Sequence, residues 1–185
     1  MKLLVYGSSE FGVVLRDVLH DCGHEFAGFV DDVHPDRPGV VGAFASARAS
    51  HPPSGYGMVL AVGYKHLEAR VRILAAARAA GYRFATLVHP DAHVHSSAVI
   101  GEGTVVMALA IVDRGARIGE SCVLWPGANI SHDSSVGGNT FVSPGAIVCG
   151  FAKVGSSCFV GAGSVIADHC TVPDGSFVKA GSVFS

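Results

Sequence analysis

The sequence has 185 residues, about half of them apolar, and a formal net charge of −2 at pH 7. This composition can supply the core of one large or two small domains, and it excludes the strongly basic surface that nucleic-acid binding needs. The apolar run Leu3 to Tyr6 is too short for a signal peptide, and no stretch reaches the ~18 apolar residues of a membrane span. We therefore expect a cytoplasmic protein without a nucleic-acid or membrane partner.

Residues 1–30 indicate the beginning of a small parallel sheet with helices. Residues 2–6 form a predicted buried strand, 7–12 a turn, 13–19 a helix and 25–30 a second strand that ends at Asp31-Asp32. A strand, a Gly-bearing turn, a helix, a strand and an acid are typical of a Rossmann-like nucleotide-binding unit. The match to the dinucleotide fingerprint is partial, because Ser9 or Glu10 stands where a further Gly is expected.

Residues 34–57 are rich in Pro, Gly, Ala and Ser and predict a loop with at most one short helix. A third strand is predicted over 58–62, ending at Gly63. Residues 67–80 predict a helix that buries Leu67, Val71, Leu74 and Ala75, and its arginines are interpreted as surface charges or phosphate contacts. A last strand over 84–88 ends at His89-Pro90, so the predicted domains are 1–88 and 89–185.

The second half of the chain repeats every six residues. From Val94 to Val178, each sixth residue is Val, Ile or Leu, and the residue four positions after each of these is always small. This period fits neither a helix nor a half-buried strand, but it is typical of a β-helix of hexapeptide repeats. Three hexads make a coil of 18 residues, so each residue should lie over the one 18 positions earlier, ~4.8 Å away. The stretch holds five coils.

A candidate catalytic pair lies at one corner of this predicted prism. His132 and Asp133 follow the inward Ile130, and the 18-residue stacking places Arg114 and Gly150 on either side of His132. A neighbouring carboxylate can fix the tautomer of an imidazole, and a glycine leaves its backbone N–H accessible. A base and a free amide could together serve the nucleophile and the oxyanion of an acyl transfer. The alternative is an ordinary surface histidine, and spacing alone leaves both readings open.

Two outer columns predict further surfaces. A column of small residues that includes Ala162 and Ala180 predicts a groove along the prism, although tight turning explains the neighbouring glycines equally well. Phe141, Phe159 and Phe177 recur at the coil period and predict an apolar stripe that another subunit buries. The histidines do not converge as zinc ligands would, so no metal site is expected.

The order of motifs along nearly the whole chain resembles the family of sialic-acid O-acetyltransferases and nucleotide-linked 4-amino-sugar N-acetyltransferases. The motifs that carry the resemblance lie at residues 6–12, 29–32, 61–63, 87–90, 130–133, 142–145 and 149–155. The resemblance implies a homotrimer of left-handed parallel β-helices, with acetyl-CoA in the cleft between neighbouring prisms.

The resemblance also implies roles for individual residues. The positions that would bind the nucleotide part of the sugar substrate are Gly7, Ser8, Ser9, Asp31, Asp32 and Gly63. His132 would act as the general base, with Asp133 orienting it. Gly150 would face the thioester carbonyl, and Ala162 and Ala180 would flank the pantetheine arm.

The chain departs from the family pattern at Glu10, Trp125 and Phe141, where relatives carry Gly, Asn and a second His. These departures bear on the identity of the acceptor. The expected function is acetyl-CoA-dependent N-acetylation of a nucleotide-linked amino-deoxy sugar. The alternatives are O-acetylation of a sialic-acid-type sugar and a non-catalytic protein of the same fold that binds sugar nucleotides.

Overall fold

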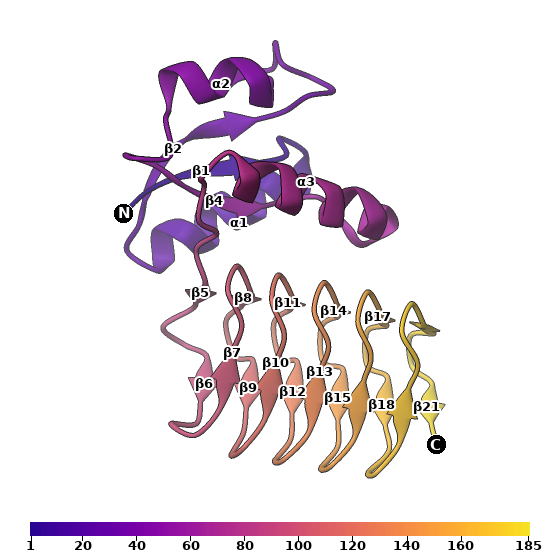
Figure 1. Ribbon diagram of the computed structural model, residues 1–185. Coiled ribbons are helices and arrows are strands. Elements are labelled where there is room, and N and C mark those ends of the chain that lie inside the picture. The colour runs from indigo at the N-terminus through magenta and orange to yellow at the C-terminus, as the bar shows by residue number, and fades with distance from the viewer. The chain divides into compact units, whose positions relative to one another are not determined.

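The computed structural model describes residues 1–185 in two units, Met1–Ala85 and Thr86–Ser185 (Figure 1). The first unit holds the helices and a four-stranded sheet, and the second is a solenoid of two-residue strands. The division lies three residues before the predicted one at residue 88. Strand β5 (Leu87–Val88) pairs with β8 of the solenoid, and of the predicted strand 84–88 only Phe84 bridges Met58 in the first unit.

In the first unit the sheet is parallel, with the strand order β3-β2-β1-β4. Its elements are β1 (Lys2–Tyr6), α1 (Glu10–Asp21), β2 (Glu25–Val30), β3 (Val40–Gly42), α2 (Phe44–Ser50), β4 (Gly57–Leu60), the 3-10 turn η1 (Tyr64–His66) and α3 (Leu67–Ala79). Strands β1 and β4 are buried on both faces apart from Lys2, as their continuous apolar runs predicted.

One short strand of this unit, β3, was not predicted, whereas α2 is the short helix that the same segment allowed. β3 pairs with β2 through Val40 and Gly42, and α2 follows directly. Both lie in the Pro- and Gly-rich segment, where no hydrophobic period is visible and pairing with β2 decides the conformation. Helix α1 also begins at Glu10, inside the predicted turn. A side chain on Gly12 would collide with the Gly7 carbonyl oxygen, so this close start of the helix requires glycine.

The predicted buried face of α3 is confirmed at Leu74 and wrong at Val71 and Ala75. Its buried residues are Arg70, Leu74 and Ala77, whereas Val71 is half exposed and Ala75 is exposed. Arg70 is 1% exposed and donates a hydrogen bond of 2.6 Å to the backbone oxygen of Val62. A buried guanidinium is tolerated only where carbonyl or carboxylate oxygens receive its donors, and the sequence gives no sign of where such oxygens lie.

The solenoid consists of three parallel sheets, which we number by their first strand (Figure 1). Sheet 1 holds β5 (Leu87–Val88), β8 (Val105–Val106), β11 (Val123–Leu124), β14 (Phe141–Val142), β17 (Phe159–Val160) and β20 (Phe177–Val178). Sheet 2 holds β6 (His93–Val94), β9 (Ile111–Val112), β12 (Asn129–Ile130), β15 (Ile147–Val148), β18 (Val165–Ile166) and β21 (Val183–Phe184). Sheet 3 holds β7 (Val99–Ile100), β10 (Arg117–Ile118), β13 (Ser135–Val136), β16 (Lys153–Val154) and β19 (Thr171–Val172).

The predicted repeat is confirmed strand by strand. Each strand pairs with the one 18 residues later, as Ile130 does with Val148, and the six-residue column forms the core of the solenoid. β-branched residues suit these short strands because they fill a buried, pleated surface. Polar members of the small column are satisfied inside: the Thr140 hydroxyl accepts a 3.1 Å hydrogen bond from the Cys158 N–H. Cys158 is thereby a structural residue, and its burial raises the pKa of its thiol.

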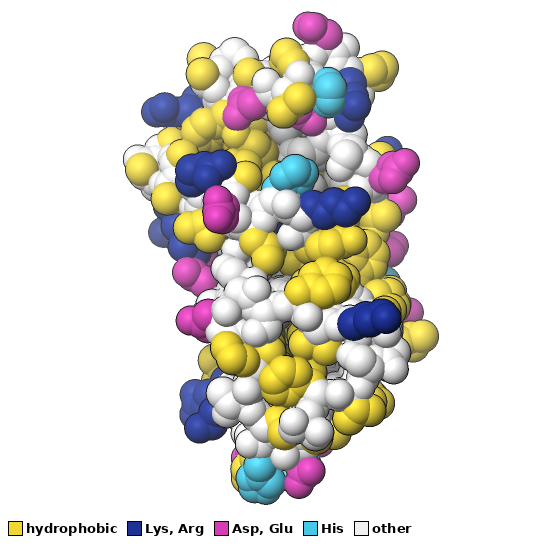
Figure 2. Space-filling view, turned by 90° about the vertical axis from the view of Figure 1, so that its right-hand side faces the viewer, with side chains coloured by type: hydrophobic (Ala, Val, Ile, Leu, Met, Phe, Trp, Pro, Cys, Tyr) yellow, Lys and Arg dark blue, Asp and Glu magenta, His cyan; other side chains and the backbone are white.

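The phenylalanines of the predicted stripe differ in solvent exposure. Phe141 is 1% exposed and Phe177 is 68% exposed, while the rings of Phe159 and Phe177 stack with centroids 4.8 Å apart. Val183 in the last strand is also 68% exposed, and Figure 2 shows the hydrophobic side chains that gather over this last coil. None of the helices combines the length and the apolar character that a membrane crossing requires.

Candidate active site

The His132 side chain lies at the corner between sheets 2 and 3, which we call edge 2–3. The corner residues 131–134 follow β12, whose Ile130 is anchored in the core, and they lead into β13. The imidazole Nδ1 lies 3.2 Å from Asp133 Oδ2. A carboxylate can only accept a hydrogen bond, so this contact places the ring proton on Nδ1 and leaves Nε2 as an acceptor.

Arg114, one coil before His132, completes the polar cluster. Its guanidinium lies 2.9 Å from the same Asp133 Oδ2, and the Asp133 N–H donates to the backbone oxygen of Arg114. The Asp133 side chain is 30% exposed, that of His132 47% and that of Arg114 64%. Asp133 is thus held from both sides, and the imidazole remains accessible.

Gly150 lies directly against the imidazole, as the 18-residue stacking predicted. A Cβ atom on Gly150 would lie 2.8 Å from His132 Cε1 and 2.9 Å from Nε2. Its N–H has no hydrogen-bond partner in the chain, whereas the N–H groups of Cys149 and Phe151 donate within the solenoid. An acceptor nitrogen and an unpaired amide therefore meet at one place on edge 2–3.

Two aromatic residues that the sequence analysis did not assign to the site also lie on this edge. The Phe151 ring meets His132 edge to face, with centroids 5.3 Å apart, and stacks on the His169 ring. The signal was present in the sequence, because Phe151 and His169 follow Asp133 at the 18-residue period. What spacing could not supply was the direction of the rings.

Ala162 and Ala180 do not join this cluster within one chain. They lie at the corner between sheets 1 and 2, which we call edge 1–2, and both are exposed. Two of the departures from the family pattern lie away from edge 2–3 as well, because Trp125 is on edge 1–2 and Phe141 is in sheet 1.

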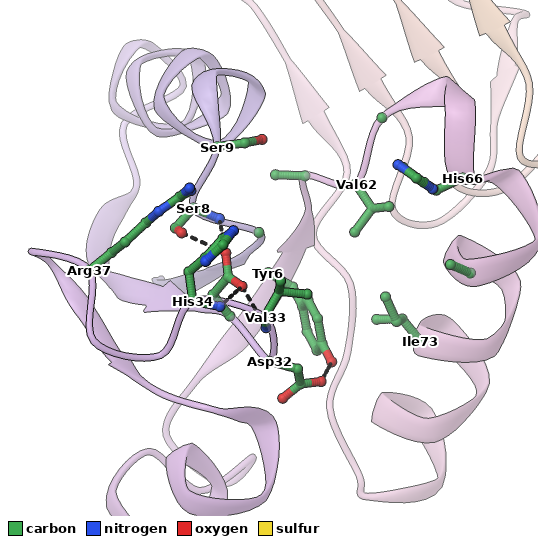
Figure 3. A pocket seen from close by; sticks show the side chains of 15 residues that line it. Tyr6, Ser8, Ser9, Asp32, Val33, His34, Arg37, Val62, His66 and Ile73 are labelled. Atoms are coloured by element: carbon green, nitrogen blue, oxygen red, sulfur yellow. Dashed lines mark hydrogen bonds between the residues drawn. The ribbon is translucent and has the colours of Figure 1, made fainter.

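The first unit contains a cavity of about 430 Å³ at the carboxyl ends of β1, β2 and β4 (Figure 3). All six predicted substrate positions line it. The full set is Tyr6, Gly7, Ser8, Ser9, Asp31, Asp32, Val33, His34, Arg37, Ala61, Val62, Gly63, His66, Ala69 and Ile73. The basic side chains of His34, Arg37 and His66 were not assigned from sequence, because two of them lie in the segment interpreted only as loop.

Asp31 is held by its own unit rather than left free. One carboxylate oxygen accepts hydrogen bonds from the N–H and the hydroxyl of Ser8, and the other accepts from the N–H groups of Val33 and His34. Burial alone would raise the pKa of this carboxyl, but the four donors lower it to about 2. Asp31 therefore ties the first turn to the loop that carries His34 and Arg37.

Asp32 and Arg70 fix the remaining walls of the cavity. Asp32 accepts hydrogen bonds from the Tyr6 hydroxyl and, at 2.7 Å, from the Phe44 N–H. Burial and the bond to Asp32 raise the pKa of the Tyr6 hydroxyl. The buried Arg70 guanidinium donates a hydrogen bond to the backbone oxygen of Val62. The cavity walls are thus set by the buried Asp31 and Arg70 and by the exposed Asp32, each with partners in the chain.

No group of three or more His, Cys, Asp or Glu side chains in the structure is arranged to hold a metal ion. The acid–base group that lies against Gly150 is the His132 imidazole, which is bonded to the Asp133 carboxylate. A solenoid built in this way from six-residue repeats defines a hexapeptide-repeat protein.

Comparison with known proteins identifies the family. Residues 83–185 match the family described as GMPPB C-terminal domain, and no curated protein matches the chain in sequence. The acetyltransferase domain of PglB from Neisseria gonorrhoeae FA1090 is 29% identical, with a TM-score of 0.88 over 100% of this chain and 91% of that chain. Its complex with acetyl coenzyme A is 31% identical, with a TM-score of 0.73 over 96% and 95%.

A third solved structure is a mutant of perosamine N-acetyltransferase from Caulobacter crescentus in complex with CoA and GDP-perosamine. It is 27% identical, with a TM-score of 0.79 over 97% of this chain and 93% of that chain. The chain belongs to the hexapeptide-repeat sugar acetyltransferases, and its residues 83–185 form a domain of the GMPPB C-terminal type.

Proposed function

We propose that the protein transfers an acetyl group from acetyl-CoA to the amine of a nucleotide-linked amino-deoxy sugar. The observation that carries this proposal is the meeting of the His132 Nε2 with the unpaired N–H of Gly150. Membership of the family and the bound molecules of the relatives, acetyl coenzyme A in one and GDP-perosamine with CoA in another, support it.

In the proposed reaction, His132 acts as the general base. A sugar amine is mostly protonated near pH 7, and only its neutral form attacks a thioester. Nε2 accepts the proton as the amine nitrogen bonds to the thioester carbon, and Asp133 stabilises the resulting imidazolium through Nδ1. The Gly150 N–H donates to the oxyanion. Collapse of the intermediate breaks the carbon–sulfur bond, and the imidazolium returns the proton to the leaving thiolate.

The proposal includes a trimer of left-handed β-helices. Ala162 and Ala180 on edge 1–2 are assigned to the pantetheine arm and His132 on edge 2–3 to the chemistry, so a complete site requires edges of two neighbouring chains. The exposed side chains of Phe177 and Val183 supply apolar surface of the kind that subunit contacts cover. Sedimentation analysis tests this directly, and a stable monomer at micromolar concentration would remove the shared cleft.

The first unit is proposed to act as a Rossmann-like domain that binds the nucleotide. Its strand order agrees with the beginning of the classic doubly wound order, and its cavity lies at the carboxyl ends of the strands. The turn Gly7-Ser8-Ser9 leads into α1, whose first N–H groups favour an anion, and Arg37 adds a cation to the same cavity. With acetyl-CoA and a sugar nucleotide as substrates, the proposed reaction is cytoplasmic.

The deciding experiment combines acetyl-CoA with UDP-, TDP- and GDP-linked amino-deoxy sugars and follows both release of the CoA thiol and the product mass. Transfer to a nucleotide-linked amine, giving an amide stable to mild base, is the expected result. A base-labile ester would indicate O-acetylation instead. Absence of transfer to every acceptor, with sugar nucleotides still binding, would leave a binding protein and contradict the proposal.

A further inference from the structure

Three aromatic rings follow one another along edge 2–3. His132, Phe151 and His169 belong to three successive coils, and each ring contacts the next. The Phe151 ring stands nearly perpendicular to the imidazole of His132, at 86°, and nearly parallel to that of His169, at 8° with centroids 4.9 Å apart. Edge-to-face and stacked pairs are the arrangements that aromatic rings prefer, so these contacts restrain the orientation of the rings.

We propose that Phe151, supported by His169, is a positioning residue that holds the His132 imidazole in the orientation needed for acetyl transfer. This inference rests on the proposed role of His132 as the base. The His132 side chain makes one hydrogen bond in the chain, from Nδ1 to Asp133, and a single bond allows the ring to swing about it. A ring pressed against the imidazole removes that freedom.

The backbone of Phe151 has the left-handed conformation that recurs at the corners of the solenoid. Its φ is +59°, in the left-handed region, where a bulky residue is strained and glycine is not. Gly115, two coils earlier in the same column, has a φ of +69°. Phe151 is also 47% exposed, so it gives up much of the burial that would compensate the strain. The strain itself belongs to the corner geometry, because Asp133 and His169 in the same column have φ values of +55° and +59°. What distinguishes Phe151 is the contact of its half-exposed ring with the imidazole of His132.

The contact between Phe151 and His132 matters for the reaction because the imidazole must both accept and return a proton. During the proposed reaction the imidazole gains a proton at Nε2 and then returns it to the thiolate, so the same atom must face the amine and the leaving group in turn. A ring fixed by Asp133 at one end and by Phe151 along its side keeps Nε2 beside the Gly150 N–H through both steps. Misplacement of a catalytic group by 1 Å can cost about a hundredfold in rate.

The test separates strain from function with the Phe151→Gly variant. Glycine relieves the left-handed backbone, so the melting temperature should stay the same or rise by ~2–4 °C. The value of kcat should nevertheless fall by about tenfold to a hundredfold, with KM for acetyl-CoA unchanged. Phe151→Tyr keeps the ring and should remain within about twofold of the unmodified enzyme.

Leu109→Gly is the matched control. Leu109 is also a bulky apolar residue in the left-handed region, with a φ of +60° and 69% of its surface exposed, but it lies on edge 1–2. Its replacement should give a similar change in melting temperature and no change in kcat. In NMR spectra, the ring-current shift of the His132 imidazole protons should be lost in Phe151→Gly and retained in Leu109→Gly.

An unchanged kcat in Phe151→Gly would overturn the inference. So would a loss of kcat that accompanies a lower melting temperature or a changed sedimentation coefficient, because Phe151 would then be a structural or interface residue. His132→Ala in the same assay distinguishes failure of the proposed base from failure of the proposed positioning role of Phe151. If that variant keeps normal turnover, the proposed base is wrong; if it is inactive while Phe151→Gly is normal, only the positioning role fails.

Discussion

The solenoid and the α/β unit both present polar groups on an apolar framework, but they hold these groups in different ways. On edge 2–3, His132 is held by neighbours one residue away and one coil away, namely Asp133, Gly150 and Phe151. In the first unit, the cavity is held by Asp31, which binds the Ser8 backbone 23 residues away, and by Arg70, which binds the Val62 backbone 8 residues away, and no repeat sets either separation.

The two regions should differ in how far the structural effect of a single substitution extends. The solenoid edge rests mainly on the backbone ladder between successive coils, so an exposed corner residue can be changed without loss of the coil. The walls of the α/β cavity depend on buried polar groups, and removal of one leaves its partners unsatisfied. Changes on edge 2–3 should therefore alter chemistry alone, and changes behind the cavity should alter stability.

His132→Ala gives the largest expected effect and tests the solenoid side of this comparison. General-base catalysis contributes ~10²–10⁴-fold, so kcat should fall within that range while KM changes little. Thermal unfolding should be nearly unchanged, because the side chain is 47% exposed. His93→Ala, an exposed histidine on β6, is the control and should retain full turnover. Near-normal activity of the His132 variant would mean that the base lies elsewhere.

Gly150→Ala should come next, with a loss of about a hundredfold in kcat, because its methyl group would displace the imidazole. The nearest atoms are those of His132, at 2.8 and 2.9 Å, and the backbone of Gly150 is not in the left-handed region. The coil itself should therefore remain folded. Gly138→Ala, which brings a Cβ within 3.2 Å of the Glu120 backbone oxygen, is the control. Turnover equal in the two variants would show that the close contact at His132 has no catalytic consequence.

Asp31→Asn tests the other side of the comparison, where the effect should appear in stability. The pKa of Asp31 is lowered to about 2, so its contribution is present at neutral pH and is lost as the pH falls from about 4 to 2. The variant should be less stable than the unmodified protein by roughly 2 kcal/mol at pH 7 and equally stable near pH 2. Denaturant unfolding across this pH range measures the difference.

Asp36→Asn, at an exposed position in the same loop, is the control and should leave stability at pH 7 unchanged. Sugar-nucleotide affinity should fall in Asp31→Asn while acetyl-CoA affinity is retained, because the cavity and edge 2–3 belong to different units. Calorimetry that found both affinities reduced together would contradict the assignment of the two ligands to separate sites.

Arg114→Gln should give the smallest effect. The ion pair with Asp133 measures 2.9 Å, but the Arg114 side chain is 64% exposed, and exposed pairs contribute only ~0–1 kcal/mol. We expect a decrease in kcat of less than about fivefold that becomes smaller at high salt, since salt screens an exposed pair. Arg117→Gln, an exposed residue of sheet 3, is the control. A loss comparable to that of His132→Ala would mean that Arg114 itself contacts a substrate.

Most of the solenoid could be predicted from its sequence. The six-residue column, the 18-residue register and the adjacency of His132, Asp133 and Gly150 all follow from spacing, because the neighbours of a residue in a stacked coil are set by its distance along the chain. The strands β1, β2 and β4 could also be predicted, because they form continuous apolar runs. Family membership followed from the order of motifs along the chain.

Only the tertiary structure decided the contacts between segments whose sequences follow no repeat. Arg70 is buried because carbonyl oxygens near the end of β4 receive its donors, and β3 is a strand because β2 lies beside it. Asp31 binds the Ser8 N–H, 23 residues away, and spacing along the chain does not place these two residues together. Spacing put Phe151 one coil above Asp133, but whether its ring turned toward His132 was a matter of packing. Sequence distance fixes neighbours where a structure repeats, and elsewhere the fold must form before the contacts exist.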